Sequence, residues 1–270
     1  MSVVAETGGY SGEHKIIIKD KAGNTADTYE NWKLVPVKPP KVNPPSVKTN
    51  FGDNPGGDGL FDLSEVVTGY PLLGQREGSW EFYVLKGWDT WSNLYSDIMD
   101  FCHGRKVQVI LSDDPQWYYN GRIGISEPDT DEDGRDKITI SYSFDPYKLS
   151  INESINADWL WDDLNFENGY IGSELFGNVS FRGTTTVTFS GRDIGRRPVT
   201  PTFKITSGSC TSIKFHNEEL WGNGDITKTS IESSNHWMDV VFTGFNPSNV
   251  ITMEIKGTGT MQVVFRPGRL

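Results

Sequence analysis

The chain has 270 residues and a mass of 30.2 kDa, a length that suits one or two domains. With 25 Lys and Arg against 36 Asp and Glu, its net charge is −11, which argues against a protein that binds nucleic acid by neutralising phosphates. Hydrophobic residues make up 36% of the chain, which is enough to form packed cores. Two Cys cannot form a disulfide framework. No apolar run comes close to the length of about 20 residues that a membrane span needs.

The N-terminal region is predicted to be rich in β-strands. It lacks the basic start and apolar stretch of a secretory signal, so we expect synthesis and assembly in the cytosol. Residues 14–19 and 34–37 have strand-like composition, and residues 20–24 form a predicted turn. Residues 39–45 contain four Pro, which donate no backbone hydrogen bonds, so this segment is predicted to be extended and outside any sheet interior.

A glycine-rich loop, a strand and the one convincing helix are predicted next. The loop covers residues 52–59 and leads into residues 60–63, and the alternating residues 80–85 suit a strand. Residues 89–103 are predicted to be helical, with Asp89 or Thr90 as the cap and Gly104 at the end. Apolar residues at helical spacing form one face, namely Trp91, Leu94, Tyr95, Ile98 and Met99.

The rest of the chain is predicted to be β-structure, which makes the fold mainly β. Further strands of the first half are predicted at residues 106–111, 122–126 and 137–144. After Ser150 the runs are short, rich in Thr, Val, Ile and Phe, and separated by Gly, Asn, Pro and Ser, as in a β-sandwich. These runs cover residues 177–181, 184–190, 202–206, 212–215, 239–243, 250–256 and 261–266. We therefore expect a β-rich domain with one helix in residues 1–149 and a β-sandwich domain in residues 150–270.

One acidic segment has the start of a calcium-loop pattern. Residues 129–134 read D-T-D-E-D-G, but the twelfth position, which would need a bidentate Glu, is Ile140. The segment also lies between two predicted strands rather than two helices. A solvated hairpin tip is therefore favoured, with a weak ion site as the alternative.

Other residues that could carry chemistry do not form a recognisable site. Adjacent acidic pairs point to opposite faces of a strand, whereas glycoside hydrolysis needs two carboxyls that face each other across a sugar. The Cys and His residues match no zinc spacing, and no phosphate-binding loop or dinucleotide fingerprint is present. We predict no catalytic residues, no metal and no cofactor. The residues considered are Asp113, Asp114, Asp162, Asp163, Glu218, Glu219, Cys102, His103, Cys210, His216 and His236.

Several motifs of the first half occur in the order and spacing of a known family. They lie within residues 57–69, 73–82, 94–106, 113–122 and 146–148, and together they resemble the distal tail protein, Dit, of siphophages that infect Gram-positive bacteria. The resemblance covers about residues 14–149, and the strand pattern and ending of the second half look like the galectin-like domain of that family. The motif residues are Gly57, Gly59, Asp62, Gly69, Arg76, His103, Gly104, Asp114, Pro115, Tyr118, Tyr119, Gly121, Arg122, Pro146, Tyr147 and Lys148.

The resemblance implies a structural protein of the virion without enzymatic activity. Dit proteins form a homohexameric ring at the tail tip, so one or two rings of this chain would join the tail tube to the host-adhesion apparatus. The implied partners are the tail tube protein, a tail-associated lysin or fibre hub, and receptor-binding or baseplate proteins, with assembly in the cytoplasm of the host bacterium. No membrane and no specific nucleic acid is expected. DNA would cross a channel lined by first domains whose 15 basic and 23 acidic residues give a charge of −8.

An alternative from another class is a carbohydrate-binding module. Aromatic side chains stack on sugar rings, and Trp221 and Trp237 lie beside polar residues typical of loop tips. In this interpretation the C-terminal domain grips host cell-surface glycans through these two residues. Trp side chains bury large areas, however, and more often build the core of a small sandwich.

Overall fold

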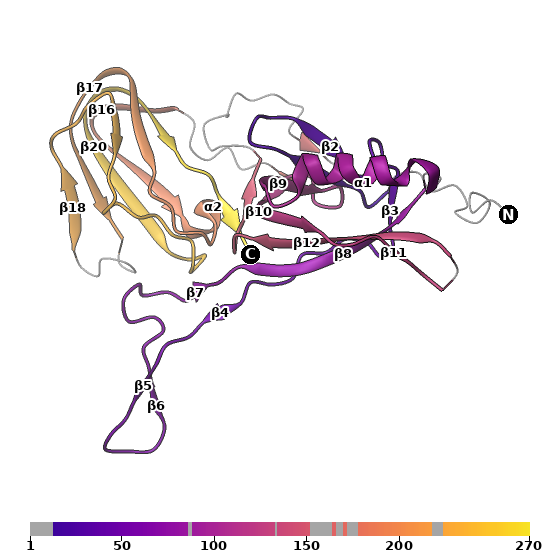
Figure 1. Ribbon diagram of the computed structural model, residues 1–270. Coiled ribbons are helices and arrows are strands. Elements are labelled where there is room, and N and C mark those ends of the chain that lie inside the picture. Colours follow the sequence, from indigo (N-terminus) through magenta and orange to yellow (C-terminus); the bar gives the residue numbers. More distant parts are fainter. Residues whose placement is uncertain are drawn as a thin grey trace. The chain divides into compact units, whose positions relative to one another are not determined.

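The computed structural model describes residues 13–85, 88–132, 134–151, 164–165, 170–171, 178–217 and 224–270. The chain divides into two compact units, Met1–Lys148 together with Leu270, and Leu149–Arg269. Both are built mainly from antiparallel strands, which confirms the predicted mainly-β class (Figure 1). No helix in the described ranges is long and apolar enough to cross a membrane.

The first unit is organised around one antiparallel sheet. Its strand order is β2-β1-β9-β10-β12-β8-β3, and β11 pairs with β12 as a short hairpin extension. The predicted strands are all present, although β8 and β10 begin well before the predicted starts at residues 80 and 122. The bounds are β1 (Ile16–Lys19), β2 (Thr25–Asp27), β3 (Leu34–Pro36), β8 (Arg76–Val84), β9 (Lys106–Leu111), β10 (Trp117–Ile125), β11 (Asp129–Thr130) and β12 (Asp136–Phe144).

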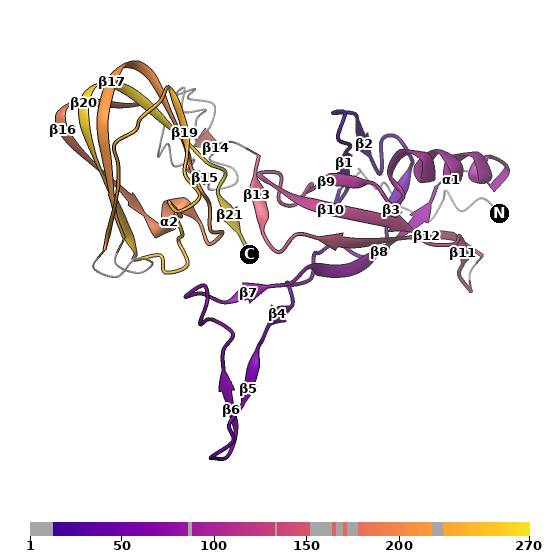
Figure 2. The ribbon, with the colours of Figure 1, turned by 60° about the vertical axis from the view of Figure 1, so that its left-hand side comes forward.

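Helix α1 (Trp88–Cys102) covers one face of this sheet (Figure 2). It begins one residue before the predicted start, and Gly104, at φ +69°, follows its end in the left-handed conformation, as predicted. Leu94 and Ile98 of its apolar face are buried, while the other three predicted residues of that face pack at the edge of the core. The helix therefore supplies the second layer over the apolar side of the strands.

The opposite face of the sheet carries charged side chains together with partly covered apolar ones. Because side chains alternate along each strand, the residues between the buried ones point away from the helix. Glu77 and Glu81 of β8 lie on this face, as do Arg122 of β10 and Lys106 of β9, and all four are exposed. Arg122 and Lys106 are direct cross-strand neighbours.

A long hairpin arm projects from the sheet between β3 and β8 (Figures 1 and 2). We define the arm as residues 47–73. Its base is the pair β4 (Val47–Lys48) and β7 (Leu72–Leu73), and its outer part is the pair β5 (Phe51–Asp53) and β6 (Leu60–Asp62). The predicted glycine-rich loop is the tip of this hairpin, so the loop prediction is right locally but missed the two strand pairs around it.

The second unit contains three long strands where the sequence predicted six short ones. These are β16 (Asn178–Ser190), β17 (Thr202–His216) and β20 (Val250–Val264), in the sheet order β16-β20-β17-β18 with β19 also beside β17. The apparent breaks contain glycines inside the strands, and in β17 and β20 these glycines lie where two backbones pass closely. A Cβ on Gly208 would lie 2.6 Å from the Cα of Gly259, for example.

The remaining elements of the second unit are short. The predicted strand at residues 239–243 is wrong, because only an isolated bridge joins Phe242 to Val199. Its described core is a cluster of phenylalanines in a curled sheet, and the galectin-like assignment stays a prediction. The short elements are β13 (Lys148–Ser150), β14 (Leu164–Asn165), β15 (Tyr170–Ile171), α2 (Gly191–Ile194), β18 (Asp225–Lys228), β19 (Ser234–His236) and β21 (Gly268–Arg269).

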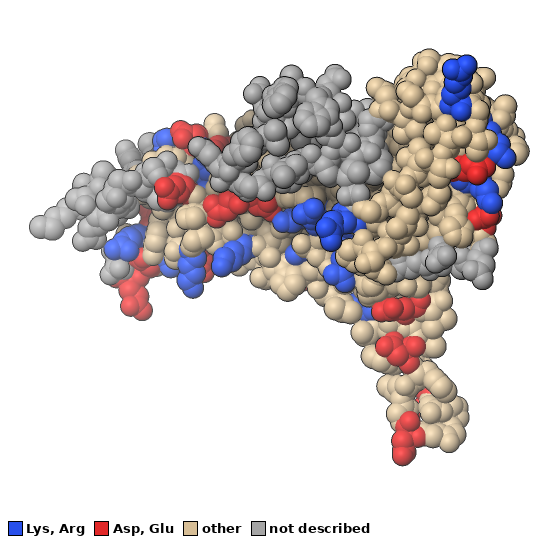
Figure 3. Space-filling view, turned by 180° about the vertical axis from the view of Figure 1, so that it is seen from behind, with Lys and Arg blue, Asp and Glu red and all other residues tan. Residues whose placement is uncertain are grey.

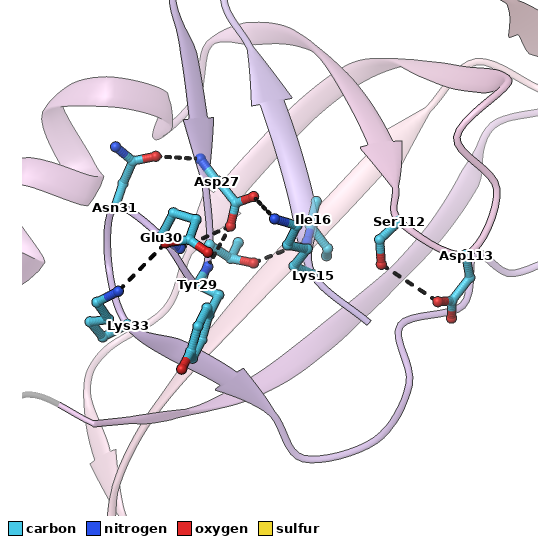
Figure 4. A network of polar contacts seen from close by, with 10 residues as sticks. Lys15, Ile16, Asp27, Tyr29, Glu30, Asn31, Lys33, Ser112 and Asp113 are labelled. Atoms are coloured by element: carbon cyan, nitrogen blue, oxygen red, sulfur yellow. Dashed lines mark hydrogen bonds and ion pairs between the residues drawn. The ribbon is translucent and has the colours of Figure 1, made fainter. Parts of the chain in front are cut away.

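Asp27 organises the loop that follows β2 (Figure 4). Its Oδ1 accepts hydrogen bonds from the backbone amides of Tyr29 and Glu30 at 2.9 and 3.0 Å, and its Oδ2 lies 2.8 Å from Lys15 Nζ. Asn31 Oδ1 accepts from the Asp27 amide at 2.7 Å. Partial burial alone would raise the pKa of Asp27, but these donors outweigh it and hold the pKa below its usual value.

We expect Asp27 to make the unfolding free energy depend on pH. Because its pKa is lower in the folded state, its contribution is complete above the unfolded pKa of about 3.9 and is lost as pH falls through the folded value. Asp27→Asn should therefore destabilise the protein at pH 6 and much less at about pH 3. Urea unfolding at both pH values measures this, with Asp58→Asn on the arm as control. An Asp27→Asn effect equal at both pH values would contradict the assignment.

Candidate functional site

Arg76, at the start of β8, joins three distant segments of the first unit. Its side chain is only 4% exposed. Its Nε donates to the carbonyl oxygen of Pro146 at 2.8 Å and its Nη1 to that of Asn43 at 2.9 Å, while the guanidinium carbon lies 5.6 Å from the Tyr119 ring centroid. Burial lowers the pKa of Arg76. The sequence singled out this arginine as a motif residue, and the structure shows that it contacts two others, Tyr119 and Pro146.

Arg76 also closes the base of the arm. Asn43 precedes the outgoing leg of the arm and Arg76 follows the returning leg, so their hydrogen bond holds the two legs together. Asn43 Nδ2 donates to the carbonyl oxygen of Glu77 at 2.8 Å, and the Gly74 amide donates to the Ser46 carbonyl oxygen at 2.7 Å. The arm therefore leaves the sheet from a hydrogen-bonded neck.

An aromatic cluster holds the proline-rich segment beside this neck. Trp80 and Tyr142 have ring centroids 4.4 Å apart, and Tyr142 stacks on Phe144 at 4.8 Å. Trp80 Nε1 donates to the Lys41 carbonyl oxygen at 2.7 Å, and the Tyr142 hydroxyl accepts from the Asn43 amide at 2.9 Å. Side chains thus hydrogen-bond to the backbone of the two residues Lys41 and Asn43 between the prolines, which themselves have no N–H to donate.

The motif residues His103, Gly104 and Arg122 fix the end of α1 to β10. The Gly104 amide donates to the Ile123 carbonyl oxygen at 2.8 Å, and Arg122 Nη1 donates to the Gly104 carbonyl oxygen at 2.7 Å. His103 Nδ1 accepts from the Ile125 amide at 2.9 Å. Because an amide can only donate, Nδ1 carries no proton in this arrangement. These three residues are structural.

The motif around Asp114 forms a turn tied to the end of the first unit. The Trp117 amide donates to the Asp114 carbonyl oxygen at 3.2 Å, which closes a turn over Pro115. The Asp114 carboxylate is 2.5 Å from Lys148 Nζ, which lies 5.5 Å from the Trp117 ring centroid. Tyr118 is 8% and Tyr119 7% exposed, and Pro146 and Tyr147 form the bend before β13.

The arm carries an exposed apolar surface. Eight large hydrophobic side chains of residues 47–73 are 40% to 94% exposed, and they make up two thirds of the twelve such side chains in the described parts of the chain. Four carboxylates and one lysine lie among them, so the arm is acidic (Figure 3). The apolar residues are Val47, Phe51, Leu60, Phe61, Leu63, Val66, Val67 and Leu72.

The arm also contains four motif residues. Gly59 and Gly69 have φ of +85° and +72°, a conformation that strains other residues. The Gly57 amide donates to the Asn54 carbonyl oxygen in the tip turn. Asp62 Oδ1 accepts from the Ser64 amide at 2.9 Å, and hydrogen bonds from Ser64 lower the pKa of Asp62. These residues shape the hairpin that presents the apolar surface.

The structure gives the residues considered for chemistry other roles. Asp113 pairs with His14 at 2.8 Å and Asp114 with Lys148, so these two carboxylates do not face each other across a cleft. Cys102 Sγ donates to the Ile98 carbonyl oxygen, and burial raises the pKa of its thiol to about 12. His216 pairs with Asp225 at 2.7 Å. Asp162, Asp163, Glu218 and Glu219 lie outside the described residues.

No metal site is found among the described residues. In the acidic segment, β11 pairs with β12, and Asp131 Oδ1 accepts from the Arg135 amide at 2.8 Å. This carboxylate therefore stabilises its own turn, which confirms the predicted hairpin tip. Asp133 lies outside the described residues.

The structure describes only one of the two tryptophans that the carbohydrate-binding alternative depends on. Trp221 lies outside the described residues. Trp237 packs on the core of the second unit, with its ring centroid 5.4 Å from that of Phe203 and 6.1 Å from that of Phe215, and Lys228 Nζ lies 5.8 Å from the ring. His236 lies near the hydroxyls of Thr200 and Thr202. Glycan binding through Trp221 and Trp237 stays a prediction.

The apolar arm is the functional feature that sequence reasoning missed. Its signal was present, because large hydrophobic residues recur from Val47 to Leu72 among glycines and acids that cannot form a core of their own. Asn43 was also missed, and only the fold brings it to Arg76.

Comparisons with known proteins identify a solved structure with a similar fold. No family model matches the chain, and no curated protein matches it. The crystal structure of SPP1 Dit (gp 19.1), described as a paradigm of the hub adsorption apparatus in phages that infect Gram-positive bacteria, aligns with a TM-score of 0.56 and 14% identity. The alignment covers 94% of this chain and 99% of that one. The Dit-like fold expected from the sequence resemblance is thus confirmed.

We expect Gly121→Ala to be strongly destabilising. Gly121 lies in β10, where a Cβ would be 2.6 Å from the Phe144 Cα and would also strike the carbonyl oxygen of Ser143. Overpacking against backbone should lower the unfolding free energy by about 2 kcal/mol or more. At Gly124, three residues along, a Cβ meets the Ser141 hydroxyl, which can rotate away. Urea unfolding of Gly121→Ala and of the control Gly124→Ala tests this. Equal losses of unfolding free energy in the two variants would show that the close approach at Gly121 is unimportant.

We expect Arg76→Lys to cost about 2 kcal/mol of unfolding free energy, because a lysine cannot replace two charged hydrogen bonds in fork geometry. Arg105→Lys, the same change at an exposed arginine, should cost about 0.5 kcal/mol or less. Thermal or urea unfolding measures both losses. Limited proteolysis of the Arg76→Lys variant should also cut first within residues 47–73. If the two variants were equally stable, Arg76 would not hold the neck.

Proposed function

We propose that this chain is a structural protein of a phage tail tip that forms a homohexameric ring between the tail tube and the host-adhesion apparatus. Two observations support the proposal. The Dit-like fold extends over nearly the whole chain. The motif residues that resemble Dit shape the arm, hydrogen-bond its neck and connect the end of α1 to β10. The protein is not an enzyme in this proposal, and it acts through surfaces.

The exposed apolar arm is the observation that carries the proposal. Soluble monomers rarely expose large contiguous apolar patches, and such a patch marks a protein interaction site. An arm that reaches out from one copy onto the next makes a head-to-tail contact, and contacts of this type close into a ring. Its four carboxylates call for an acceptor surface with an apolar centre and basic surroundings.

The open polar face of the first sheet suits a channel wall. It carries Glu77 and Glu81 on one side and Lys106 and Arg122 on the other, so the described part of this face mixes both signs of charge. DNA binding through phosphates needs a continuous basic surface, and this face does not offer one. DNA could pass along such a wall without being held.

The proposed partners follow from the position in the tail. The ring would stack on the tail tube protein on one side and meet a tail-associated lysin or fibre hub on the other. The second unit would hold receptor-binding or baseplate proteins. The protein would be a virion component that assembles in the cytoplasm of the host bacterium.

We expect the double variant Phe61→Asp/Val67→Asp to lose the ring. Both side chains are exposed, so charges on them should leave the unfolding free energy of the monomer nearly unchanged while preventing burial in a neighbour. Light scattering behind size exclusion should give six protomers, or twelve, for the wild type and a mass well below six for the variant.

Met238→Asp is the matched control, because Met238 is 74% exposed but lies outside the arm. It should keep the wild-type mass. A wild-type protein that stays monomeric at every concentration, or a double variant with unchanged mass, would contradict the proposal.

A further inference from the structure

Three arginines of the second unit lie within six consecutive residues and form no ion pair. Arg192 lies in α2, at the end of β16, and Arg196 and Arg197 follow the glycine that caps this helix (Figure 1). The first two are exposed and Arg197 is partly exposed. In the part of the chain that the structure describes, none of the ion pairs involves any of the three. Because guanidinium groups pair well with carboxylates, these arginines suit an acidic partner.

The three segments that meet at this place are basic, although the chain as a whole is acidic. The Gly244 amide donates to the Gly195 carbonyl oxygen at 2.9 Å, and the Arg197 amide donates to the Gly268 carbonyl oxygen at 3.2 Å. The sequences of the three segments contain five arginines and one acidic residue, Asp193, in a chain with 36 acidic and 25 basic residues. Positive charge is therefore concentrated here. The segments are residues 191–200, 241–250 and 264–269.

Apolar side chains lie beside these arginines. The Arg196 guanidinium carbon lies 4.7 Å from the centroid of the Phe245 ring, which is partly exposed. Val250 is 48% exposed, and a backbone hydrogen bond of 2.7 Å between residues 191 and 249 holds it beside the start of α2. The place therefore combines basic and apolar side chains. We define the arginine patch as Arg192, Arg196, Arg197, Phe245 and Val250.

The arm of the first unit has the complementary composition. Its four carboxylates are all exposed, and none of them belongs to an ion pair found in the described residues. It also carries two thirds of the large exposed hydrophobic side chains of the described residues. A contact between the arm and the patch would pair charges and cover apolar surface on both sides. The carboxylates are Asp53, Asp58, Asp62 and Glu65.

We propose that the arginine patch of one copy receives the arm of a second copy. This inference rests on the proposed function, because it names the surface that accepts the arm in the ring. Carboxylates of the arm pair with the arginines, while apolar side chains of the arm cover Phe245 and Val250. The arm and the patch are different surfaces, so the contact is head-to-tail and can repeat from copy to copy until the ring closes.

Two full-length variants test the contact, because each removes one side of it. Phe61→Asp/Val67→Asp alters the arm and keeps the patch, whereas Arg192→Glu/Arg196→Glu alters the patch and keeps the arm. We expect each variant alone to have a mass well below six protomers in light scattering behind size exclusion. An equimolar mixture should give a complex of two copies and no larger, because one intact arm meets one intact patch.

A charge exchange tests whether the arm is the partner of the patch. Adding Asp58→Lys/Glu65→Lys to Arg192→Glu/Arg196→Glu restores opposite charges across the contact. We expect this to lower the dissociation constant at least tenfold relative to the patch variant, as measured by sedimentation equilibrium. The matched control is Arg182→Glu/Lys204→Glu, which makes the same change in net charge at exposed positions of the second unit outside the patch. It should keep the wild-type mass.

The outcomes separate this inference from the proposed function. Mixed pairs and rescue by charge exchange support the patch as the acceptor. If the patch variant kept the wild-type mass of six or twelve protomers, the ring would stand and the arm would bind elsewhere, so the inference would be overturned. Patch and arm variants that do not associate when mixed, or a charge exchange without rescue, would overturn it as well. A wild-type protein that is always monomeric would contradict both proposals.

Discussion

The burial of one guanidinium, that of Arg76, is the contact on which the first unit depends. A charged group taken out of water must find hydrogen-bond acceptors, and the two carbonyl oxygens that serve it come from residues 43 and 146, more than 100 positions apart. The two hydrogen bonds of this side chain therefore fix the proline-rich segment, the start of β8 and the end of the unit together. The direction of the arm follows, because both of its legs begin at this neck.

The neck and the arm have opposite physical characters, and this contrast supports an assembling protein. In the neck, Arg76 is buried and hydrogen-bonded to Asn43 and Pro146, and an aromatic cluster packs beside it. The arm beyond it has no core of its own and exposes its hydrophobic residues to water. A hydrogen-bonded base that presents an uncovered apolar surface helps to pre-organise that surface for a partner, which lowers the entropy lost on binding.

Local periodicity in the sequence was sufficient for much of the fold. The bounds of β9 and the buried face of α1 were predictable because alternation and helical spacing are set within a few residues. In the second unit the same reasoning divided long strands at glycines. The sequence alone does not distinguish a glycine at a turn from a glycine where two strand backbones pass closely. Gly208 and Gly259 differ from turn glycines only because another strand passes beside them.

The sequence by itself determined the mainly β class, the helix, the extended proline segment and the motif residues that resemble Dit. Each of these depends on residue types and short-range spacing. Only the tertiary structure decided that Asn43 meets Arg76, that Asp114 meets Lys148, and that the glycine-rich loop is the tip of an exposed apolar arm. These features depend on which segments lie side by side and which surfaces stay uncovered. Such properties arise from contacts between residues far apart in the chain, which spacing along one sequence does not encode.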